Sequence, residues 1–307
     1  MTEPSEIEAA AAGLYPIRTV ARRTGVNPVT LRAWERRYGL VRPHRTAGGH
    51  RLYSDSDIER IQRIMQMLGA GMAIGRVARV LEQPPEVVAD NPLMDNAWDL
   101  CRQKLREAVR VFDSARLEQV YNEALAIYPV TLVTSRVISP LLQELGEDWA
   151  RGEASVAEEH FFSVFLRNKL GARFHHRQGQ TSGPRIVLAC VPGEAHEIGL
   201  MLFALSALAR NFRVVLLGAN MPLAPLSDTV RQCGAEALVL AAGANMDWAT
   251  VEADFRQHVS SMDVPVAVGG GICDRHAGAI RATGALALGE DHDAALLALD
   301  ALLRKPR

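Results

Sequence analysis

The stretch Val191-Pro-Gly-Glu-Ala-His-Glu-Ile-Gly199 places a histidine in a glycine-bounded loop between two apolar segments. The segment before it, residues 185–190, is short, β-branched and continuously apolar, as is typical of a strand buried on both faces of a sheet. The segment after it, residues 198–210, repeats apolar residues at helical spacing. This order predicts a ligand site at the loop, because ligands of open α/β sheets bind at the carboxyl ends of strands.

The imidazole of His196 is a suitable ligand for a transition metal, and Glu194 is placed to orient the ring by accepting a hydrogen bond. A lone loop histidine is more often a surface residue, so the neighbouring spacing decides between the two interpretations. The pattern Glu-x-His-x-x-Gly, which ends at Gly199, resembles the Asp-x-His-x-x-Gly fingerprint of cobalamin-binding domains. In that family the histidine replaces the cofactor's own base beneath cobalt. The resemblance implies that the chain binds adenosylcobalamin, with His196 as the cobalt ligand.

The family fingerprint continues with a Ser-x-Leu motif and a Gly-Gly pair, and this chain matches their spacing but not the first motif. Ala241-Ala-Gly243 stands where Ser-x-Leu is expected, so a serine hydroxyl that contacts the nucleotide tail of the cofactor is missing. The small alanine leaves room for the tail, and the glycines let the backbone approach a ligand closely. By the resemblance, the cofactor-binding residues of this region are Glu194, His196, Gly199, Ala241, Gly243, Gly269, Gly270 and Gly271.

Five apolar segments with strand character alternate with helical segments in the last part of the chain. This alternation over residues 184–307 predicts a doubly wound parallel sheet of the flavodoxin-like kind. A dinucleotide-binding domain is the nearest alternative, but the first turn lacks Gly-x-Gly-x-x-Gly. A phosphoacceptor receiver domain is a second alternative, but it needs acidic residues at the strand ends. The expected strands are 186–190, 214–218, 238–242, 264–269 and 285–289.

Near its start the chain is strongly basic, with thirteen arginines against four acidic residues from Tyr15 to Arg79. Such a local excess of arginine is the electrostatic pattern of a nucleic-acid-binding segment. Residues 17–24 read as a short helix, and Pro28 begins a second helix with Asn27 as its N-cap. Two short helices around a glycine turn make a helix-turn-helix.

A glycine-tipped hairpin, residues 39–53, follows the second helix and reads as a wing. The strings Thr30-Leu-Arg-x-Trp-Glu-Arg-Arg-Tyr-Gly-Leu and Gly48-Gly-His-Arg-Leu-Tyr53 closely resemble the N-terminal winged helix of MerR-type transcription regulators. A solvated arginine-rich helix, the alternative, does not account for the turn, the hairpin and the aromatic positions together. The resemblance covers residues 15–83 and implies binding to double-stranded operator DNA. The implied contact residues are Thr30, Arg32, Arg36, Arg37 and Tyr38 from the helix and Arg45, His50 and Arg51 from the wing.

A polar, proline-marked segment, residues 84–97, reads as a linker. Dimeric MerR-type regulators continue into a long helix with apolar heptads, and this sequence does not sustain such heptads. We therefore expect the C-terminal part of the chain to assemble the protein into a homo-oligomer.

Overall composition places limits on the class of protein. Lys and Arg number 34 and Asp and Glu 35, so any basic surface must be local. The cysteines are dispersed and indicate neither a disulfide framework nor a zinc site. Residues 1–14, expected to be disordered, lack the basic-then-apolar order of a signal peptide, and no apolar run reaches transmembrane length. A cytoplasmic protein without a membrane partner is the expectation.

Residues 98–178 alternate helical patterns with proline breaks and predict a small helical bundle. Trp149, followed after nine residues by Glu159-His160, resembles Trp-x9-Glu-His, the cap signature of CarH-like cobalamin-dependent, light-responsive repressors. The alternative is that Trp149 is a core residue and that the Glu-His pair merely starts a helix, where acids are favoured. By the resemblance, Trp149 shields the upper face of the cofactor, and Glu159 and His160 contact its adenosyl group. Ala150 stands where CarH-like proteins commonly carry a second histidine for cobalt.

Together these patterns predict a multidomain α/β protein with an N-terminal winged helix-turn-helix, a helical cap and a C-terminal cobalamin-binding sheet. The resemblance implies a repressor without enzymatic activity. Its adenosylcobalamin-bound oligomer, commonly a tetramer in the family, would bind the operator in the dark and release it in the light. Two alternatives stay open: a cobalamin sensor that does not respond to light, and a cobalamin-dependent methyl-transfer protein, which would have no use for the winged helix.

Overall fold

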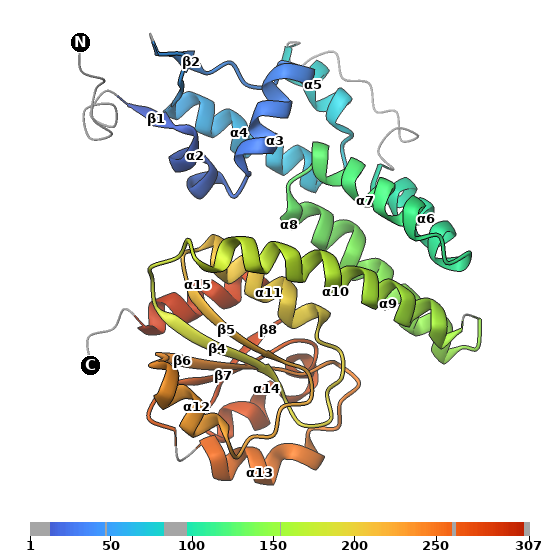
Figure 1. Ribbon diagram of the computed structural model, residues 1–307, viewed down its shortest axis with the longest axis vertical. Coiled ribbons are helices and arrows are strands. Elements are labelled where there is room, and N and C mark those ends of the chain that lie inside the picture. Colours follow the sequence, from blue (N-terminus) through green and yellow to red (C-terminus); the bar gives the residue numbers. More distant parts are fainter. Residues whose placement is uncertain (1–12, 47, 83–96, 154, 260–261, 304–307) are drawn as a thin grey trace. The chain divides into compact units, whose positions relative to one another are not determined.

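Two compact units make up the chain, Met1–Phe162 and Ser163–Arg307. The expected disordered terminus, residues 1–14, and the expected linker, residues 84–97, lie almost entirely outside the residues that the computed structural model describes. Figure 1 shows the chain coloured along its sequence. The described residues are 13–46, 48–82, 97–153, 155–259 and 262–303.

The first part of the chain folds as the expected helix-turn-helix (Figure 1). Gly25 ends the first helix in the left-handed conformation, with a φ of 71°. The side chain of Asn27 then accepts a hydrogen bond from Thr30 N at 2.8 Å, as an N-cap does. Beyond Ala33 the second helix widens into a π-helical turn. These elements are α2 (Ile17–Thr24), α3 (Pro28–Ala33) and η1 (Trp34–Tyr38).

An antiparallel sheet with strand order β1-β3-β2 forms the wing. The hairpin is as expected, whereas the third strand, β1, was not predicted; it lies beside β3 with Tyr15 opposite Tyr53. Ser54 then starts the next helix in a capping box, in which Asp57 N donates to the Ser54 hydroxyl and Ser54 N donates to the Asp57 carboxylate. The elements are β1 (Leu14–Pro16), β2 (His44–Arg45), β3 (Arg51–Ser54), α4 (Asp55–Gly69) and α5 (Ile74–Glu82).

The predicted helical bundle is present and follows the winged helix in the first unit. Asp113 caps its second helix by accepting a hydrogen bond from Arg116 N at 2.9 Å. No helix among the described residues is long and apolar enough to cross a membrane. The bundle consists of α6 (Ala97–Arg110), α7 (Ser114–Ile127), α8 (Val130–Val133), η4 (Thr134–Ile138), α9 (Ser139–Ala150) and α10 (Val156–Gln178), which continues into the second unit.

Two indole groups connect the winged helix with the bundle. The Nε1–H of Trp34 donates to the carbonyl oxygen of Ile127 at 2.8 Å, and that of Trp98 donates to the carbonyl oxygen of Leu68 at 3.1 Å. Both acceptors lie in the last turn of a helix, where carbonyl groups have no partner within the helix. Trp34 therefore satisfies the carbonyl at the end of α7, whereas the Leu68 carbonyl also accepts a hydrogen bond from Gly71 N at 2.9 Å. The winged-helix core extends to Tyr128 of the bundle.

The second unit is built on a five-stranded parallel sheet with strand order β5-β4-β6-β7-β8, which confirms the predicted flavodoxin-like fold. Each strand lies within two residues of its expected position. The order reverses between β4 and β6, so the carboxyl ends of these two strands form the switch point at which such sheets bind ligands. The strands are β4 (Arg185–Cys190), β5 (Arg213–Gly218), β6 (Ala237–Ala241), β7 (Val266–Gly269) and β8 (Leu286–Gly289).

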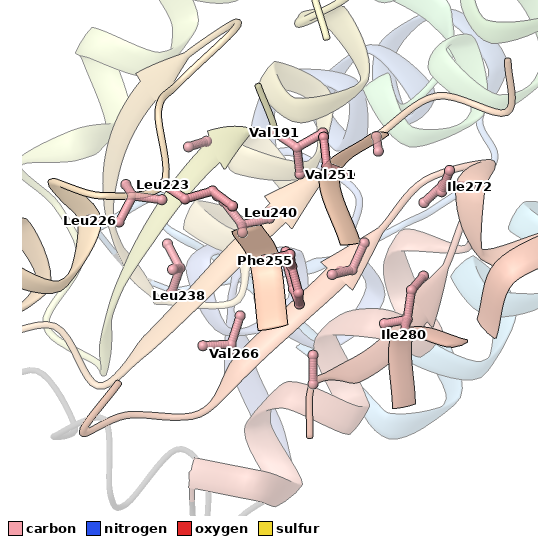
Figure 2. Packing of buried hydrophobic residues seen from close by; sticks show 14 of the residues in the cluster. Val191, Leu223, Leu226, Leu238, Leu240, Val251, Phe255, Val266, Ile272 and Ile280 are labelled. Carbon is pink, nitrogen blue, oxygen red and sulfur yellow. The ribbon is translucent and has the colours of Figure 1, made fainter. Parts of the chain in front are cut away.

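An apolar cluster covers each face of this sheet. One cluster, part of which Figure 2 shows, joins inward side chains of the strands, such as Leu240, to Phe255 and Ile272 of the covering helices. The other joins the opposite face to Phe174 of α10 and Phe203. Burial on both faces accounts for the continuously apolar strands of the sequence. The helices are α11 (Ile198–Ala209), α12 (Leu226–Cys233), α13 (Ala249–Val259), α14 (Ile272–Ala282) and α15 (His292–Leu303).

The indole bond of Trp34 yields a prediction about stability. Replacing Trp34 by Phe keeps an aromatic ring but leaves the partly buried Ile127 carbonyl without this donor, which should lower the free energy of unfolding by about 1–2 kcal/mol. Trp149→Phe is the matched control, because Trp149 is 55% exposed and should change stability by less than about 0.5 kcal/mol. Urea unfolding without added ligand, followed by circular dichroism, measures both. Equal effects of the two substitutions would contradict the prediction.

Candidate functional site

A buried carboxylate, Glu194, organises the loop at the carboxyl end of β4. Its side chain is 6% exposed. One oxygen accepts hydrogen bonds from the backbone N and from ring Nδ1 of His196, both at 2.8 Å. The other oxygen accepts a hydrogen bond at 2.7 Å from Gly243 N, in the loop that follows β6. Glu194 thus joins the two loops of the switch point and holds the histidine ring.

The hydrogen bond that His196 donates to Glu194 determines which nitrogen of the ring is available to a ligand. A carboxylate can only accept, so Nδ1 carries the proton and Nε2 presents its lone pair. The His196 side chain is 81% exposed, so Nε2 is accessible from solvent. Such a carboxylate–histidine pair is the usual support of a metal-binding imidazole.

The donor set restricts the kind of metal that fits. Within the described residues, no group of three or more His, Cys, Asp or Glu side chains could hold a bare metal ion. A single exposed imidazole therefore suits a metal that brings its other ligands with it, as the cobalt of a corrin ring does. The residues present fit the cofactor expected from the sequence.

The glycines of the expected fingerprint have two different surroundings. A Cβ atom at position 271 would lie 2.7 Å from the Cβ of Ala244, and one at position 243 would lie 2.9 Å from a carboxylate oxygen of Glu194. These glycines, with Gly270 beside the Ala242 carbonyl, let the loops after β6 and β7 lie against each other. By contrast, nothing lies within 4 Å of a Cβ at Gly199, in the first turn of α11. The open surface near His196 is therefore at Gly199.

An ion pair that the sequence analysis missed secures the other side of the histidine loop. Arg167 of α10 lies 2.6 Å from Glu197, the residue after His196. A Cβ at Gly218, at the end of β5, would lie 2.9 Å from the second carboxylate oxygen of Glu197. The Glu-x-His-Glu sequence alone gives no signal for this pair, because Arg167 is about thirty residues away in the chain.

The expected cap residues are in the first unit. Trp149 is 55% exposed, so the alternative that it is a core residue is wrong. Glu159 is in the first turn of α10 and His160 follows it, so the pair lies near the start of a helix, as the second part of that alternative supposed. His160 Nδ1 lies 3.0 Å from a carboxylate oxygen of Glu159 and 3.0 Å from the Val156 carbonyl, and the side chain of His160 is 72% exposed. An exposed indole and an exposed imidazole are thus available to a ligand.

The side chains expected to contact DNA separate into an exposed and a supporting set. Arg32, Arg36 and Arg37 are exposed on α3 and η1, as a DNA-contacting face requires. Thr30 is fully buried, so the expectation that it belongs to the exposed polar face is wrong. Its neighbour Leu31 is buried as well, because this part of α3 contacts the helical bundle as well as the winged-helix core.

Tyr38 and the wing residues have other surroundings. Tyr38 is half-buried and packs against the winged-helix core. His50 is exposed at the tip of the wing. Arg45 and Arg51 both bind Glu35 of the recognition segment, at 2.8 and 2.5 Å. The wing arginines therefore hold the wing against η1, and Arg45, whose side chain is 52% exposed, is also accessible to a phosphate group.

Glu35 was not recognised in the sequence, although an acid within an arginine-rich helix is a signal for an internal ion pair. Its burial alone would raise the pKa of the carboxyl group. The hydrogen bonds and charges of Arg51 and Arg45 outweigh burial, so the pKa of Glu35 lies below its usual value of 4.5. Glu35 is therefore ionised at neutral pH and attaches the wing.

Comparison with known proteins gives two family matches and several relatives. Residues 15–84 match the MerR HTH family regulatory protein model, and residues 101–173 match the B12 binding domain model. The chain is 34% identical to the HTH-type transcriptional repressor CarH of Myxococcus xanthus over 70% of this chain and 74% of that protein. It is 31% identical to the repressor CarA of the same organism over 88% of this chain and 91% of that protein.

A solved structure supports the fold of the bundle and sheet. The monomethylamine corrinoid protein of Methanosarcina barkeri aligns with a TM-score of 0.54 and 20% identity, and the match covers 67% of this chain and all of that chain. At this identity the likeness shows a shared fold alone.

The Glu35 ion pairs yield a prediction about pH. Because the folded pKa is lowered, these pairs stabilise the protein above pH 4.5, and the contribution is lost as pH falls below 4.5 through the folded pKa. Glu35→Gln should therefore lower the free energy of unfolding by about 1 kcal/mol at neutral pH and have little effect at low pH. Urea unfolding at both pH values measures the difference, and the exposed Glu59→Gln is the control. If Glu35→Gln lowered the free energy of unfolding by the same amount at both pH values, the result would contradict an ionised, paired Glu35.

Proposed function

Because this chain belongs to the family of MerR-type transcriptional repressors with a cobalamin-binding domain, we propose that it is a light-sensing member whose adenosylcobalamin-bound oligomer binds its operator in the dark. Membership of this family implies that the chain binds DNA through its winged helix, uses cobalamin as cofactor and regulates transcription. The relatives that cover most of the chain are transcriptional regulators, not enzymes.

The Glu194–His196 pair is the observation that carries the proposal for the cofactor. His196 would hold cobalt through Nε2 from below, and Glu194 would keep the proton on Nδ1 so that Nε2 stays a ligand. Gly199 would leave room for the corrin ring beside the histidine. Gly243, Gly270 and Gly271 would keep the surrounding loops in place rather than touch the ring.

The cap residues support the adenosyl form and the response to light. The apolar indole of Trp149 is exposed on the first unit, which suits a residue that shields a ligand. Glu159 and His160 offer an acceptor and an imidazole to the hydroxyl groups of an adenosyl group. When bound, the cofactor supplies a cobalt–carbon bond that visible light breaks, and the protein sets its surroundings. Loss of the adenosyl group would remove the partner of all three side chains.

Assembly is the proposed link between the cofactor and DNA. One winged helix reads a short site, and linking several copies raises the effective concentration of each at the operator. A ligand shifts assembly only if it binds the assembled state more tightly. We infer that the adenosyl form favours a homo-oligomer, commonly a tetramer in CarH-like proteins, and that light returns it to smaller species.

The central test uses DNA selected by the dark, adenosylcobalamin-loaded protein from a random-sequence pool. Mobility shift and sedimentation should show a large DNA-binding species in the dark and small, weakly binding species after illumination. Because Ala150 has no donor atom to hold the displaced cap, gel filtration after illumination should also remove cofactor. A dark complex that survives illumination would favour the alternative of a light-independent cobalamin sensor.

A matched control separates DNA contact from assembly in this experiment. Arg36→Ala combined with Arg37→Ala removes two exposed charges of the recognition segment. DNA affinity should fall with a shallower salt dependence, while the cofactor-dependent mass stays unchanged. Unchanged DNA affinity would contradict the proposed interface.

Glu194→Gln tests the ligation by His196. The Gly243 amide and the His196 amide are both donors and need acceptor oxygens, and glutamine has only one. The oxygen can keep the bond from Gly243 or the two bonds from His196, and either orientation sets the NH2 group against an N–H donor, so the His196 ring is held less firmly. The absorption spectrum of bound cobalamin should lose its histidine-ligated form, and affinity should fall about tenfold or more. Glu252→Gln, on the surface of α13, is the control and should bind as wild type; equal behaviour of the two variants would contradict the assignment.

A further inference from the structure

Two acidic residues are buried in the part of the chain that the structure describes, and each lies beside a residue of the proposed cofactor site. Glu194 is 6% exposed and holds the ring of His196. Asp148 is also 6% exposed and lies directly before Trp149, at the end of α9. Removing a carboxylate from water is costly unless partners replace its hydration. The partners of Asp148 therefore indicate what its burial stabilises.

Asp148 pairs with arginines from two different elements. One carboxylate oxygen pairs with Nη2 of Arg106, on α6, and the other lies 2.5 Å from Nη2 of Arg151, which follows the last residue of α9. Arg106 also lies 3.2 Å from Glu144, one helical turn before Asp148. Partly buried ion pairs are screened by salt less than surface pairs. Two ion pairs one turn apart therefore join α6 to α9 and oppose sliding between the two helices.

The backbone at the end of α9 is closed by hydrogen bonds as well. Gly152 N donates to the Trp149 carbonyl at 2.9 Å, and Glu153 N donates to the Asp148 carbonyl at 2.8 Å. Gly152 has a φ of 74°, a left-handed conformation that lets the chain turn back over the helix end. Carbonyl groups in the last turn of a helix have no partner within the helix, and here the following turn supplies one. The backbone on both sides of the Trp149 side chain is thus fixed.

Trp149 extends from this fixed helix end. Successive residues of an α-helix point about 100° apart, so the burial of Asp148 against α6 directs the next side chain away from its ion pairs. Trp149 is accordingly 55% exposed. A side chain that orders on a ligand loses conformational freedom, and fixing its backbone beforehand reduces that cost. Asp148 can therefore strengthen binding by Trp149 without touching a ligand.

We propose that Asp148 is a positioning residue for the cap: with Arg106 and Arg151 it fixes the end of α9 that carries the Trp149 indole, and it thereby raises the preference for cobalamins that carry an adenosyl group. The inference rests on the proposed role of Trp149 above the cofactor. Methylcobalamin has the same corrin ring and the same lower face, but only a methyl group above cobalt. Its binding depends less on the position of Trp149.

The test measures the preference for the adenosyl group in the dark. Wild type, Asp148→Asn and Glu147→Gln are titrated with adenosylcobalamin and with methylcobalamin. Asp148→Asn keeps the shape of the side chain but loses its charge, and the ratio of the two affinities should fall about fivefold. Glu147→Gln is the matched control, because Glu147 is exposed, lies 3.9 Å from the same Arg151 and should leave the ratio unchanged. Equal loss of affinity for both ligands in Asp148→Asn, or no loss for either, overturns the proposal.

A double-mutant cycle with Trp149→Ala distinguishes positioning of the indole from a general structural role. If Asp148 acts through Trp149, Asp148→Asn should not change the affinity ratio further in the Trp149→Ala background, whereas additive effects contradict the proposal. Circular dichroism checks folding. If Asp148→Asn does not fold, Arg106→Lys takes its place in both experiments, because lysine keeps the charge but lacks the planar guanidinium group, and the same changes in ratio are expected.

The cycle also separates this inference from the proposed function. If Trp149→Ala lowers the affinity ratio and Asp148→Asn does not, this inference fails and the proposed cap stands. If Trp149→Ala leaves the ratio unchanged, the proposed cap fails and this inference fails with it.

Discussion

The buried carboxylate of Glu194 is the constraint on which the cofactor site depends. Removing a charge from water is costly unless hydrogen bonds replace its hydration. Here the backbone of His196, its ring and the backbone of Gly243 donate to that charge. The same bonds therefore satisfy the carboxylate, bring the loops after β4 and β6 together and select the histidine nitrogen that stays free. A neutral residue at this position could not perform all of these tasks, because it lacks the acceptor capacity.

In the DNA-binding part, one short segment also has several roles, because its side chains face three different environments. Arg32, Arg36 and Arg37 point to solvent, Glu35 binds the wing, and Trp34 donates to the bundle. Helical geometry makes this possible, because successive residues point in different directions around the axis. The orientation of the recognition segment is thus set by the wing and by the last turn of α7 together. The ion pairs of Glu35 also explain why an acidic residue is present in a segment that is expected to bind DNA.

Helix α10 contributes residues to both compact units. Glu159 and His160 lie near its start, and Arg167 of the same helix pairs with Glu197 beside His196. The division between the compact units falls within this helix.

The sequence by itself determined the order of elements and most of the chemistry. Apolar strand segments, the Asn27 and Ser54 caps and the spacing from His196 to the glycines are local patterns, and local patterns persist in the folded chain. Tertiary structure alone decided the burial of Thr30, the attachment of Arg45 and Arg51 to Glu35 and the pairing of Arg167 with Glu197. Each of these depends on residues far apart in the chain. Periodicity shows which residues face inward, but only the packed fold shows which group each one meets, because hydrogen-bond partners are set by distances in space.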